Sequence, residues 1–240
     1  MPATKTNEFD QPIGFAMEDW QPCKLPPATP VTGQYCRIEP FDPDLHNKKL
    51  FEAMTHTGSE INWTYLPYGP FDNFDDFDTW TRESCQEQDP MFHTVIDLKS
   101  GDPVGIASYL RIVPEQGVIE VGHIHFSPLL QRTALATEAM FLMMRRVFDE
   151  LGYRRYEWKC DELNKPSCRA AERFGFQFEG IFRQALMYKN RNRDTAWFAI
   201  IDQDWPAIKQ AFEQWLNVDN FDSDGKQKMR LADLMAKANN

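Results

Sequence analysis

Hydrophobic and polar positions divide the chain into segments with two periodicities. Three apolar segments, 92–98, 104–113 and 118–126, are separated by the turn sequences Ser-Gly-Asp-Pro and Pro-Glu-Gln-Gly. Short apolar runs between such turns are typical of an antiparallel meander, so we expect three strands here. The next segment, 137–151, has apolar residues at helical spacing and ends at Gly152, which predicts a long helix.

One strand and two helices are expected before the meander. The strand covers 34–39, and the first helix covers 44–55, with its apolar residues near one side. Asp72 can cap the second helix, in which aromatic residues recur every three positions up to Trp80.

A strand, a short helix and a closing hairpin are expected after the long helix. The strand covers 153–160, and the hairpin consists of 176–189 and 195–201. The short helix between them has Asn164 as its cap and Gly175 as its left-handed stop. Together the elements predict an α/β fold of the α+β type, with a mixed, mostly antiparallel sheet of about seven strands flanked by helices.

The composition of the two ends predicts three parts. Six prolines among polar residues mark 1–33 as an N-terminal arm, because proline disfavours helices and central strands. We expect the domain itself over 34–205 and a helical C-terminal extension over 206–240. In this extension a weakly amphipathic helix over 226–238 could dock on the domain, pair with a second subunit or fray.

The passage from strand 118–126 into the long helix carries the first candidate chemistry. Pro128 is followed by Gln131-Arg-Thr-Ala-Leu-Ala136, which brings small residues to the start of the helix. Backbone N–H groups at a helix start have no partner within the helix, and the helix dipole favours an anion there. We therefore predict a phosphate-binding turn.

The short helix carries the second candidate. Asn164-Lys-Pro-Ser167 opens this helix, where Pro166 suits the first turn, and Gly175-Phe176 closes it. Two such segments in this order fit one βαβ unit.

Both segments resemble acyl-CoA-binding motifs of the GNAT superfamily of N-acyltransferases. The first motif is written Val-x-Pro-x-x-(Gln/Arg)-x-x-Gly-x-(Gly/Ala), and Pro128, Gln131, Ala134 and Ala136 occupy its marked positions. Ala134 departs from the pattern, because most members have glycine there. The resemblance covers 34–205, and the phrases EVGHI, Asn-x-x-Ser and ERFGF are most similar to the RimJ/RimL branch of ribosomal-protein N-terminal acetyltransferases.

The resemblance implies acetyl-CoA as cosubstrate, with no requirement for a metal ion. It implies that the strand before Pro128 pairs with pantetheine, that the turn holds the pyrophosphate, and that Asn164 contacts the CoA arm. Arg132 either adds a charge-assisted contact to a phosphate or faces solvent. The implied cofactor-binding residues are Ile124, Phe126, Gln131, Arg132, Thr133, Ala134, Leu135, Ala136, Asn164 and Ser167.

Acyl transfer to an amine needs a general base, for which the resemblance favours Glu120 and leaves His123 as the second candidate. Burial would raise the pKa of Glu120 as a base requires, whereas the alternative is a strand carboxylate paired with an arginine. Strict alternation places Glu120 with Gly122 and Ile124 on one face, and His123 with His125 on the other. A bulge near Gly122 would change this arrangement.

Many GNAT enzymes use a tyrosine to protonate the leaving thiolate, and that position is Ala171 here. By resemblance to the RimJ/RimL branch, Ser167 is the hydrogen-bond donor to the thiolate, with helix-start hydrogen bonding as the alternative role. We do not expect Cys168 to act as a nucleophile, because GNAT transfer is direct and no histidine lies near it in the sequence.

The acceptor amine is expected near the loop that contains Trp63, Tyr65 and Tyr68. Aromatic residues on a proline-stiffened loop can shape a pocket. The alternative is that they cover an edge of the core.

Charge and cysteine content narrow the partners and the compartment. The formal charge of -10 disfavours nucleic-acid binding, and it suits cationic acceptors or simple solubility. The five scattered cysteines indicate neither a disulfide framework nor a zinc site. Without a signal sequence or an apolar run of membrane length, we expect a cytoplasmic protein that makes no membrane contact.

The leading hypothesis is an acetyl-CoA-dependent N-acetyltransferase that acts on a small-molecule amine or a protein N-terminus, with a homodimer among its expected states. One alternative is a CoA-binding or interaction module without catalysis, which Ala134 and Ala171 favour and which Glu120, Asn164 and Ser167 argue against. Another is acetylation of aminoacyl-tRNA, as in toxin-like relatives, which the acidic balance disfavours.

Overall fold

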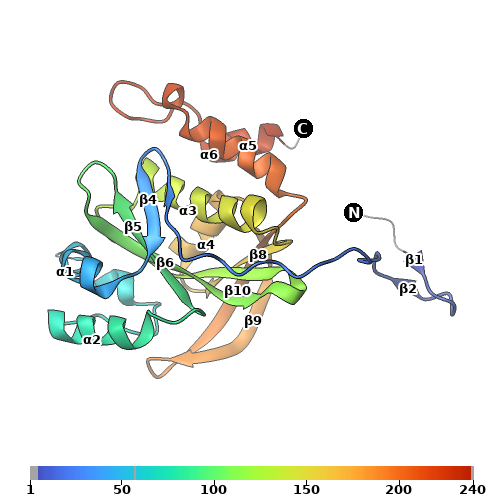
Figure 1. Cartoon of the computed structure of the whole chain (residues 1–240), viewed down its shortest axis with the longest axis horizontal. Coiled ribbons are helices and arrows are strands. Elements are labelled where there is room, and N and C mark those ends of the chain that lie inside the picture. Colours follow the sequence, from blue (N-terminus) through green and yellow to red (C-terminus); the bar gives the residue numbers. More distant parts are fainter. Residues whose placement is uncertain (1–4, 57, 239–240) are drawn as a thin grey trace.

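The computed structural model describes residues 5–56 and 58–238 and is built around one large sheet (Figure 1). Neighbouring strands are antiparallel except β7 and β8, which are parallel, so the predicted mixed, mostly antiparallel sheet is confirmed. The eight strands lie in the order β3 (Val31–Thr32), β4 (Cys36–Pro40), β5 (Met91–Asp97), β6 (Pro103–Val113), β7 (Val118–Phe126), β8 (Arg155–Asp161), β10 (Arg191–Ile201) and β9 (Gln177–Tyr188).

Helices cover both faces of this sheet. On one face, α1 (Pro43–Met54) and α2 (Phe74–Ser84) enclose a small core with Phe92 of β5 and Ile106 of β6. On the other face, α3 (Ala134–Arg145), α4 (Lys165–Arg173) and α5 (Trp205–Leu216) enclose the main core. α3 joins β7 to β8, because parallel neighbours need a crossover connection.

The predicted strands of the meander agree with β5, β6 and β7 to within one residue at each end. Alternation and turn residues both mark these strands, so their sequence signal is strong. β3 adds an eighth strand that was not predicted, because two residues are too few to show a periodicity.

Side-chain caps set the ends of α2 and α4. α2 is capped by Asn73, whose side chain accepts from the N–H of Asp76, and the prediction of Asp72 as its cap was wrong. The Asn164 cap of α4 and the left-handed Gly175 after it are confirmed. Asn73 is the better cap because its side chain lies three residues before the N–H that it accepts from, as N-cap geometry requires.

α3 begins earlier than predicted, at Ala134, because the hydroxyl of Thr133 caps it by accepting from the N–H of Ala136 at 3.1 Å. The helix continues as a π-helical turn, Arg146–Glu150, toward the left-handed Gly152. Shorter 3-10 turns lie at Glu60–Trp63, Pro114–Gln116 and Val218–Asn220.

A buried carboxylate fixes α3 to the first strands. Glu138 of α3 accepts from the backbone N–H groups of Gln34, Tyr35 and Cys36 at 2.6, 2.6 and 2.8 Å. A Cβ on Gly33 would lie 2.4 Å from this carboxyl group, so only glycine fits beside it. The helix that starts at the predicted phosphate-binding turn is therefore anchored near its N-terminus.

The two ends of the described chain differ in how they meet the domain. The proline-rich arm pairs β1 (Lys5–Thr6) with β2 (Pro12–Ile13) and extends beyond the sheet before joining it (Figure 1). At the other end, α5 contributes Phe212 and Trp215 to the main core, and α6 (Leu231–Ala238) packs beside α5. The C-terminal helix could have docked on the domain, paired with a second subunit or frayed, and in this structure it docks on the domain.

Candidate active site

The parallel strands β7 and β8 separate partway along their length. Their pairing runs from Val118 with Arg155 to Val121 with Trp158, and it stops there although both strands continue. We call the unpaired portions, 122–126 and 159–161, the β7–β8 fork. Backbone groups of the fork lack ladder partners in the opposite strand, and an extended ligand that contains amides can pair with such an edge.

A bulge at His123 lies where the fork begins. In the pairing with β6, Ser108 faces Gly122 while Ile106 faces His125, so β7 contains one extra residue. His123 takes a left-handed φ of 49°, which non-glycine residues rarely adopt. The bulge considered from the sequence is therefore present, one residue after Gly122.

This bulge brings both base candidates to the same face of the sheet. Glu120 points away from α3, because its two neighbours in β7 belong to the main core. His123 turns to the same side, where its ring meets Tyr68, and Ile124 packs toward the main core instead. Of the two arrangements considered from the sequence, the structure has the one with a bulge, because the extra residue reverses the alternation after Gly122.

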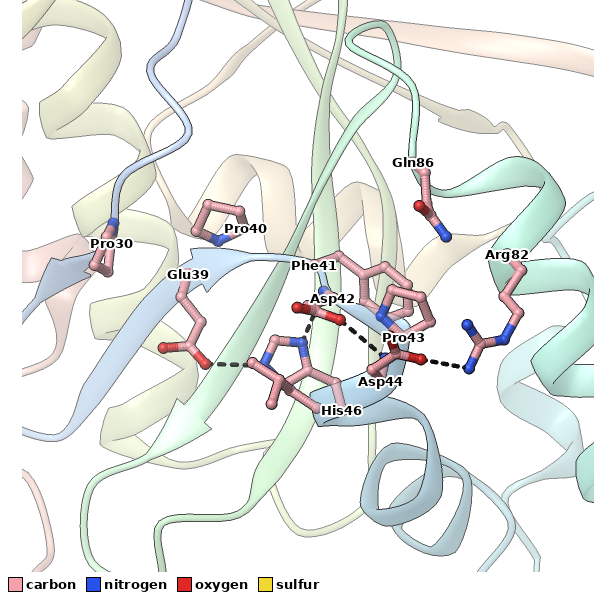
Figure 2. Close-up of a pocket in the computed structure, with 11 residues that line it drawn as sticks. Pro30, Glu39, Pro40, Phe41, Asp42, Pro43, Asp44, His46, Arg82 and Gln86 are labelled. Atoms are coloured by element: carbon pink, nitrogen blue, oxygen red, sulfur yellow. Dashed lines mark hydrogen bonds and ion pairs between the residues drawn. The ribbon is translucent and has the colours of Figure 1, made fainter.

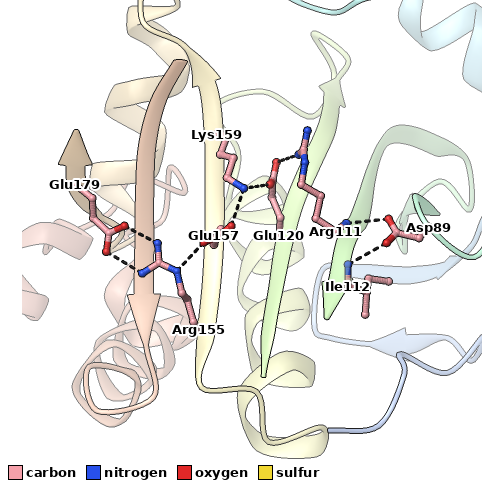
Figure 3. A network of polar contacts seen from close by, with 8 residues as sticks. All are labelled: Asp89, Arg111, Ile112, Glu120, Arg155, Glu157, Lys159 and Glu179. Atoms are coloured by element: carbon pink, nitrogen blue, oxygen red, sulfur yellow. Dashed lines mark hydrogen bonds and ion pairs between the residues drawn. The ribbon is translucent and has the colours of Figure 1, made fainter. Parts of the chain in front are cut away.

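Glu120 belongs to a row of alternating charges on this face (Figure 3). Its carboxylate contacts Arg111 at 2.7 Å and Lys159 at 2.8 Å, and 3% of its side chain is exposed. Burial raises the pKa of Glu120, although the two cations act in the opposite direction. Glu120 is thus a strand carboxylate paired with an arginine, which was the alternative to its role as a general base. The whole row runs through Arg111, Glu120, Lys159, Glu157, Arg155 and Glu179.

Arg111 reaches Glu120 from a second irregular position. Its φ is 47°, and the register of β6 with β7 shifts nearby. Asp89 holds this backbone, because its carboxylate accepts from the N–H groups of Arg111 at 2.8 Å and Ile112 at 3.0 Å (Figure 3). The sequence patterns did not indicate Arg111, Asp89 or Lys159, because cross-strand register decides which charges meet.

The imidazole of His123 lies among aromatic rings. The Tyr68 ring is parallel to it at a centroid distance of 5.7 Å, and the Tyr68 hydroxyl lies 3.0 Å from Nδ1. Phe92 approaches the same ring at 5.0 Å. Burial, and secondarily the Arg111 guanidinium, lowers the pKa of His123 to about 4. The ring is therefore neutral at neutral pH, and when Nδ1–H donates to Tyr68, Nε2 is a free acceptor.

The aromatic residues of the loop that was predicted to contact the acceptor have different surroundings. Trp63 is 2% exposed, and its ring packs edge-on against that of His125 with a centroid distance of 3.8 Å. Trp63 thus covers an edge of the core, which was the alternative role for this loop. Tyr68 contacts His123 at the start of the fork, while the Tyr65 hydroxyl donates to the carbonyl of Leu163, just beyond β8, at 3.2 Å. Tyr65 and Tyr68 thus contact the segments on both sides of the fork.

Two cations tether this loop to the β9–β10 hairpin. Lys189 Nζ donates to the Trp63 carbonyl at 2.8 Å, and Arg191 Nη2 donates to the Thr64 carbonyl at 2.7 Å. The loop therefore has a fixed place relative to the hairpin.

Aromatic residues of the hairpin adjoin the charged row. Trp197 of β10 stacks on Phe182 of β9 at 4.4 Å, and the ammonium of Lys159 lies 3.8 Å from the centre of the Trp197 ring. These contacts join the hairpin to the face that carries Glu120.

The predicted phosphate-binding turn connects β7 to α3, and some of its donors are already used. The Gln131 N–H donates to the Ser127 carbonyl, and the Gln131 side chain donates to the Phe126 carbonyl at 2.7 Å. The Ala136 N–H is used by the Thr133 cap. The donors of Gln131 and Ala136, which were expected to contact a phosphate, are thus used for hydrogen bonds within the turn.

The donors between them are free. Within residues 5–56 and 58–238, the backbone N–H groups of Arg132, Thr133, Ala134 and Leu135 donate to no protein acceptor. Arg132 has a left-handed φ of 62°, and successive N–H groups around such a residue converge on one point, which suits an anion. The turn itself, 127–137, contains no carboxylate side chain. The residues present therefore fit the diphosphate of CoA.

Asn164 and Ser167 lie at the start of α4, next to the end of β8. The Asn164 side chain accepts from the Ser167 N–H at 3.2 Å, and the Ser167 hydroxyl accepts from the Trp158 indole N–H at 3.0 Å. Helix-start hydrogen bonding therefore involves the backbone N–H of Ser167. Its hydroxyl accepts from Trp158 and keeps a proton to donate, with the thiol of Cys160 within reach. Cys168 lies 3.6 Å from Cys160, sulfur to sulfur, rather than beside a histidine.

A cavity of about 530 Å³ lies away from the fork, at the start of α1 (Figure 2). Its wall carries three carboxylates, two of which contact a basic side chain within the wall. His46 contacts Glu39 at 2.8 Å, and Arg82 donates to Asp44 at 2.8 Å. None of its lining residues was a predicted site residue.

The described part of the chain contains neither a cluster of metal ligands nor a membrane-spanning helix. No three His, Cys, Asp or Glu side chains lie close enough there to share a metal ion. No helix among these residues is both long and apolar enough to cross a membrane.

Comparison with known proteins agrees with this geometry. The family model described as "Acetyltransferase (GNAT) domain" matches residues 37–177. An uncharacterized N-acetyltransferase, YnaD, from Bacillus subtilis (strain 168) is 29% identical over 86 residues, which are 36% of this chain and 50% of that protein. The chain thus spans about half the length of this curated relative.

Two solved structures are similar over much more of the chain. A GCN5-related N-acetyltransferase from Brucella melitensis is 46% identical with a TM-score of 0.90, covering 92% of this chain and all of that one. A probable acetyltransferase of the GNAT family from Chromobacterium violaceum is 41% identical with a TM-score of 0.76, covering 82% of this chain and 98% of that one. The fork, the free N–H groups and the start of α4 therefore lie in a fold shared with acetyltransferases.

Proposed function

The chain belongs to the GNAT family of acetyltransferases, and we propose that it transfers an acetyl group from acetyl-CoA directly to a primary amine. The observation that carries this proposal is the β7–β8 fork, which has the free N–H groups of the α3 turn at one end and a neutral imidazole at its start. When bound, acetyl-CoA would supply the acetyl group as an activated thioester.

The residues that would hold acetyl-CoA come from three backbone segments. The N–H groups of Arg132 through Leu135 hold the diphosphate, aided by the positive end of the α3 dipole. The unpaired edge of β7 from His123 to Phe126 pairs with the amides of pantetheine. Asn164, at the start of α4, contacts the CoA arm.

For the proton of the amine, we propose His123 as the acceptor. The residue is partly buried at the start of the fork, and its ring is neutral at neutral pH and can present Nε2. Glu120 is the second candidate, since burial raises its pKa. However, both of its oxygens contact cations and little of it meets solvent, so its proton would have to pass through water or a neighbouring side chain. Glu120 more directly serves to hold Arg111 and Lys159 in place.

Ser167 is proposed as the hydrogen-bond donor to the departing thiolate. The Trp158 indole N–H occupies a lone pair of the Ser167 oxygen, which orients the hydroxyl and leaves its proton for another acceptor. A hydroxyl of unchanged acidity stabilises rather than protonates a thiolate, and such a contact is strongest where charge develops.

The acceptor is proposed to be a small-molecule amine or a protein N-terminus, the latter following from the resemblance to the RimJ/RimL branch. Tyr65 and Tyr68 lie on the loop that reaches both sides of the fork, so they are proposed to contact this acceptor. The alternative of a CoA-binding module without catalysis is less well supported, because the imidazole of His123 lies at the start of the fork and is unprotonated at neutral pH, as a base requires.

Two measurements on the purified chain test the proposal. Titration calorimetry should detect acetyl-CoA binding with a Kd on the order of micromolar, worth about 8 kcal/mol. A panel of amines, including polyamines, amino-acid amides and short peptides with free N-termini, should then contain at least one that releases free CoA thiol and appears as an acetylated product by mass spectrometry. If calorimetry detects no heat of binding, the proposal is contradicted. If acetyl-CoA binds but no amine gives a product, the CoA-binding module without catalysis is favoured.

A further inference from the structure

Residues 5–17 form an arm that has one ring contact with the domain, between Phe15 and the Arg154 guanidinium at 5.9 Å. In the described chain, no hydrogen bond, ion pair or ring contact joins residues 5–14 to anything beyond them. The β1–β2 hairpin of this arm lies clear of the sheet in Figure 1. Its large apolar side chains are nevertheless exposed: Phe9 by 72%, Ile13 by 43%, Phe15 by 41% and Met17 by 39%. An isolated two-stranded hairpin is marginally stable in water, so this one needs a surface to cover it.

The root of the arm is firmly attached. The Trp20 indole donates to the Glu115 carbonyl at 2.9 Å, and the Cys23 N–H donates to the Pro114 carbonyl at 3.1 Å. A Cβ on Gly117 would lie 2.5 Å from the Trp20 ring, so the indole is closely packed at the start of β7. The arm therefore projects from a defined point.

A second uncovered apolar surface lies on β9, the last strand of the sheet. Phe182 stacks on Trp197 and lies on the face of the charged row, whereas Phe178 packs on Phe198 of the main core on the opposite face. Exposed apolar side chains gathered on such an edge strand mark an interaction site. Register shifts interrupt the pairing of β9 with β10, and Gln184 has a left-handed φ of 51°. Such bulges hinder the addition of a further strand, so side chains are the suitable cover. The exposed apolar residues of β9 are Phe178, Ile181, Phe182, Leu186 and Met187.

The two surfaces have opposite charge. The arm, residues 5–17, contains two carboxylates and one lysine, whereas residues 177–201 contain four basic and two acidic residues. The hairpin is thus a basic region in a chain with a formal charge of -10. An acidic, apolar arm complements this basic, apolar hairpin, and charge complementarity favours and orients such an encounter.

We propose that the arm of one copy docks on the β9–β10 hairpin of a second copy and that the exchange is reciprocal. Each chain carries both members of the complementary pair, as a two-fold symmetric interface requires. The exchange covers the apolar side chains of both arms and both hairpins. Because Phe182 stacks on Trp197 beside Lys159, the docked arm lies next to the charged row that carries Glu120.

Sedimentation analysis of the full chain tests the proposal without reference to activity. The full chain should sediment at twice its 28.0 kDa mass, and the dimer should weaken at high salt. Removal of residues 2–17, or Phe182→Asp, should each give a monomer whose circular dichroism spectrum is that of the folded chain. Leu45→Asp is the matched control, because Leu45 is 73% exposed on α1 and lies outside both surfaces.

Mixing the two monomeric variants gives the decisive result. The Phe182→Asp chain retains its arm, and the truncated chain retains its hairpin, so together they should form a heterodimer through one remaining contact. A full chain that is monomeric at tens of micromolar overturns the proposal, as does a dimer that survives truncation. Should truncation impair folding, Phe9→Asp combined with Phe15→Asp takes its place, with the same two outcomes.

Discussion

The two sides of the β7–β8 fork are built in different ways. On the side of the α3 turn, the candidate groups are backbone N–H donors from four consecutive residues, Arg132 to Leu135, set by one cap and one left-handed residue. On the side of Glu120 and His123, they are side chains brought together from separate strands and a loop. The first side is a local structure, and the second is a product of tertiary packing.

This difference predicts how each side responds to substitution. A site made of backbone donors tolerates changes of side chain unless the new side chain enters the anion site or repels its charge. A site made of side chains loses its function when one group is removed, because no neighbour can replace that group. Substitutions on the two sides should therefore separate acetyl-CoA binding from turnover.

The largest effect is expected from His123→Asn. Asparagine tolerates the left-handed backbone of the bulge, so the change removes the imidazole with little strain. Turnover should fall by about 100-fold, as is typical for loss of a general base, while the Kd for acetyl-CoA stays within about 2-fold. Steady-state kinetics and calorimetry measure the two quantities.

Two variants serve as controls for that result. His56→Asn makes the same chemical change at an exposed position after α1 and should leave turnover unchanged. Glu120→Gln weakens contacts with two cations, so it should lower the melting temperature and reduce turnover less than His123→Asn. A greater loss of turnover in Glu120→Gln would transfer the base role to Glu120.

A smaller effect, confined to binding, is expected from Ala134→Glu. The new carboxylate would lie among the free N–H groups of the turn and repel the diphosphate, weakening acetyl-CoA binding by about 30-fold, or about 2 kcal/mol. Ala134→Gly is the matched control, because it restores the residue usual in the motif, and its Kd should change by less than about 3-fold. Unchanged binding by the glutamate variant would mean that the diphosphate is held elsewhere.

The smallest effect concerns the pH profile. Burial and the Arg111 guanidinium lower the pKa of His123 to about 4, so the imidazole stays neutral as the pH falls through 6.5 and gains its proton only near pH 4. After correction for protonation of the amine, kcat/KM should show no inflection near pH 6.5. Arg111→Met removes one cause of the low pKa, so its acidic limb should move to higher pH. An inflection near 6.5 in the unaltered chain would contradict this assignment.

The same contrast explains how far the sequence could be interpreted. Alternation and turn residues predicted β5 to β7, and the motif spacing predicted the α3 turn and the Asn164 cap, since all of these signals are local. The start of α3 was placed too late because Thr133 was not identified as its cap. The positions of Arg111 and Lys159 beside Glu120 depend on cross-strand register, which no single segment reveals.

The bulge at His123 shows the same limit within one strand. The sequence allowed a bulge near Gly122 but could not place it, because bulges are seen only against the neighbouring strand. One additional residue there decides whether Glu120 and His123 share a face. Whether the two base candidates lie on the same face thus depends on the register between β6 and β7.

The contacts of Lys189 and Arg191 with the carbonyl groups of Trp63 and Thr64 have a structural consequence for diversification of the enzyme. They act as spacers of fixed length between the loop that carries Tyr65 and Tyr68 and the last hairpin, and neither contributes to the α3 turn. Shorter or longer residues at these two positions would reset the distance between the loop and the hairpin without altering that turn. If this loop contacts the acceptor as proposed, the size of the acceptor can change during evolution independently of the donor.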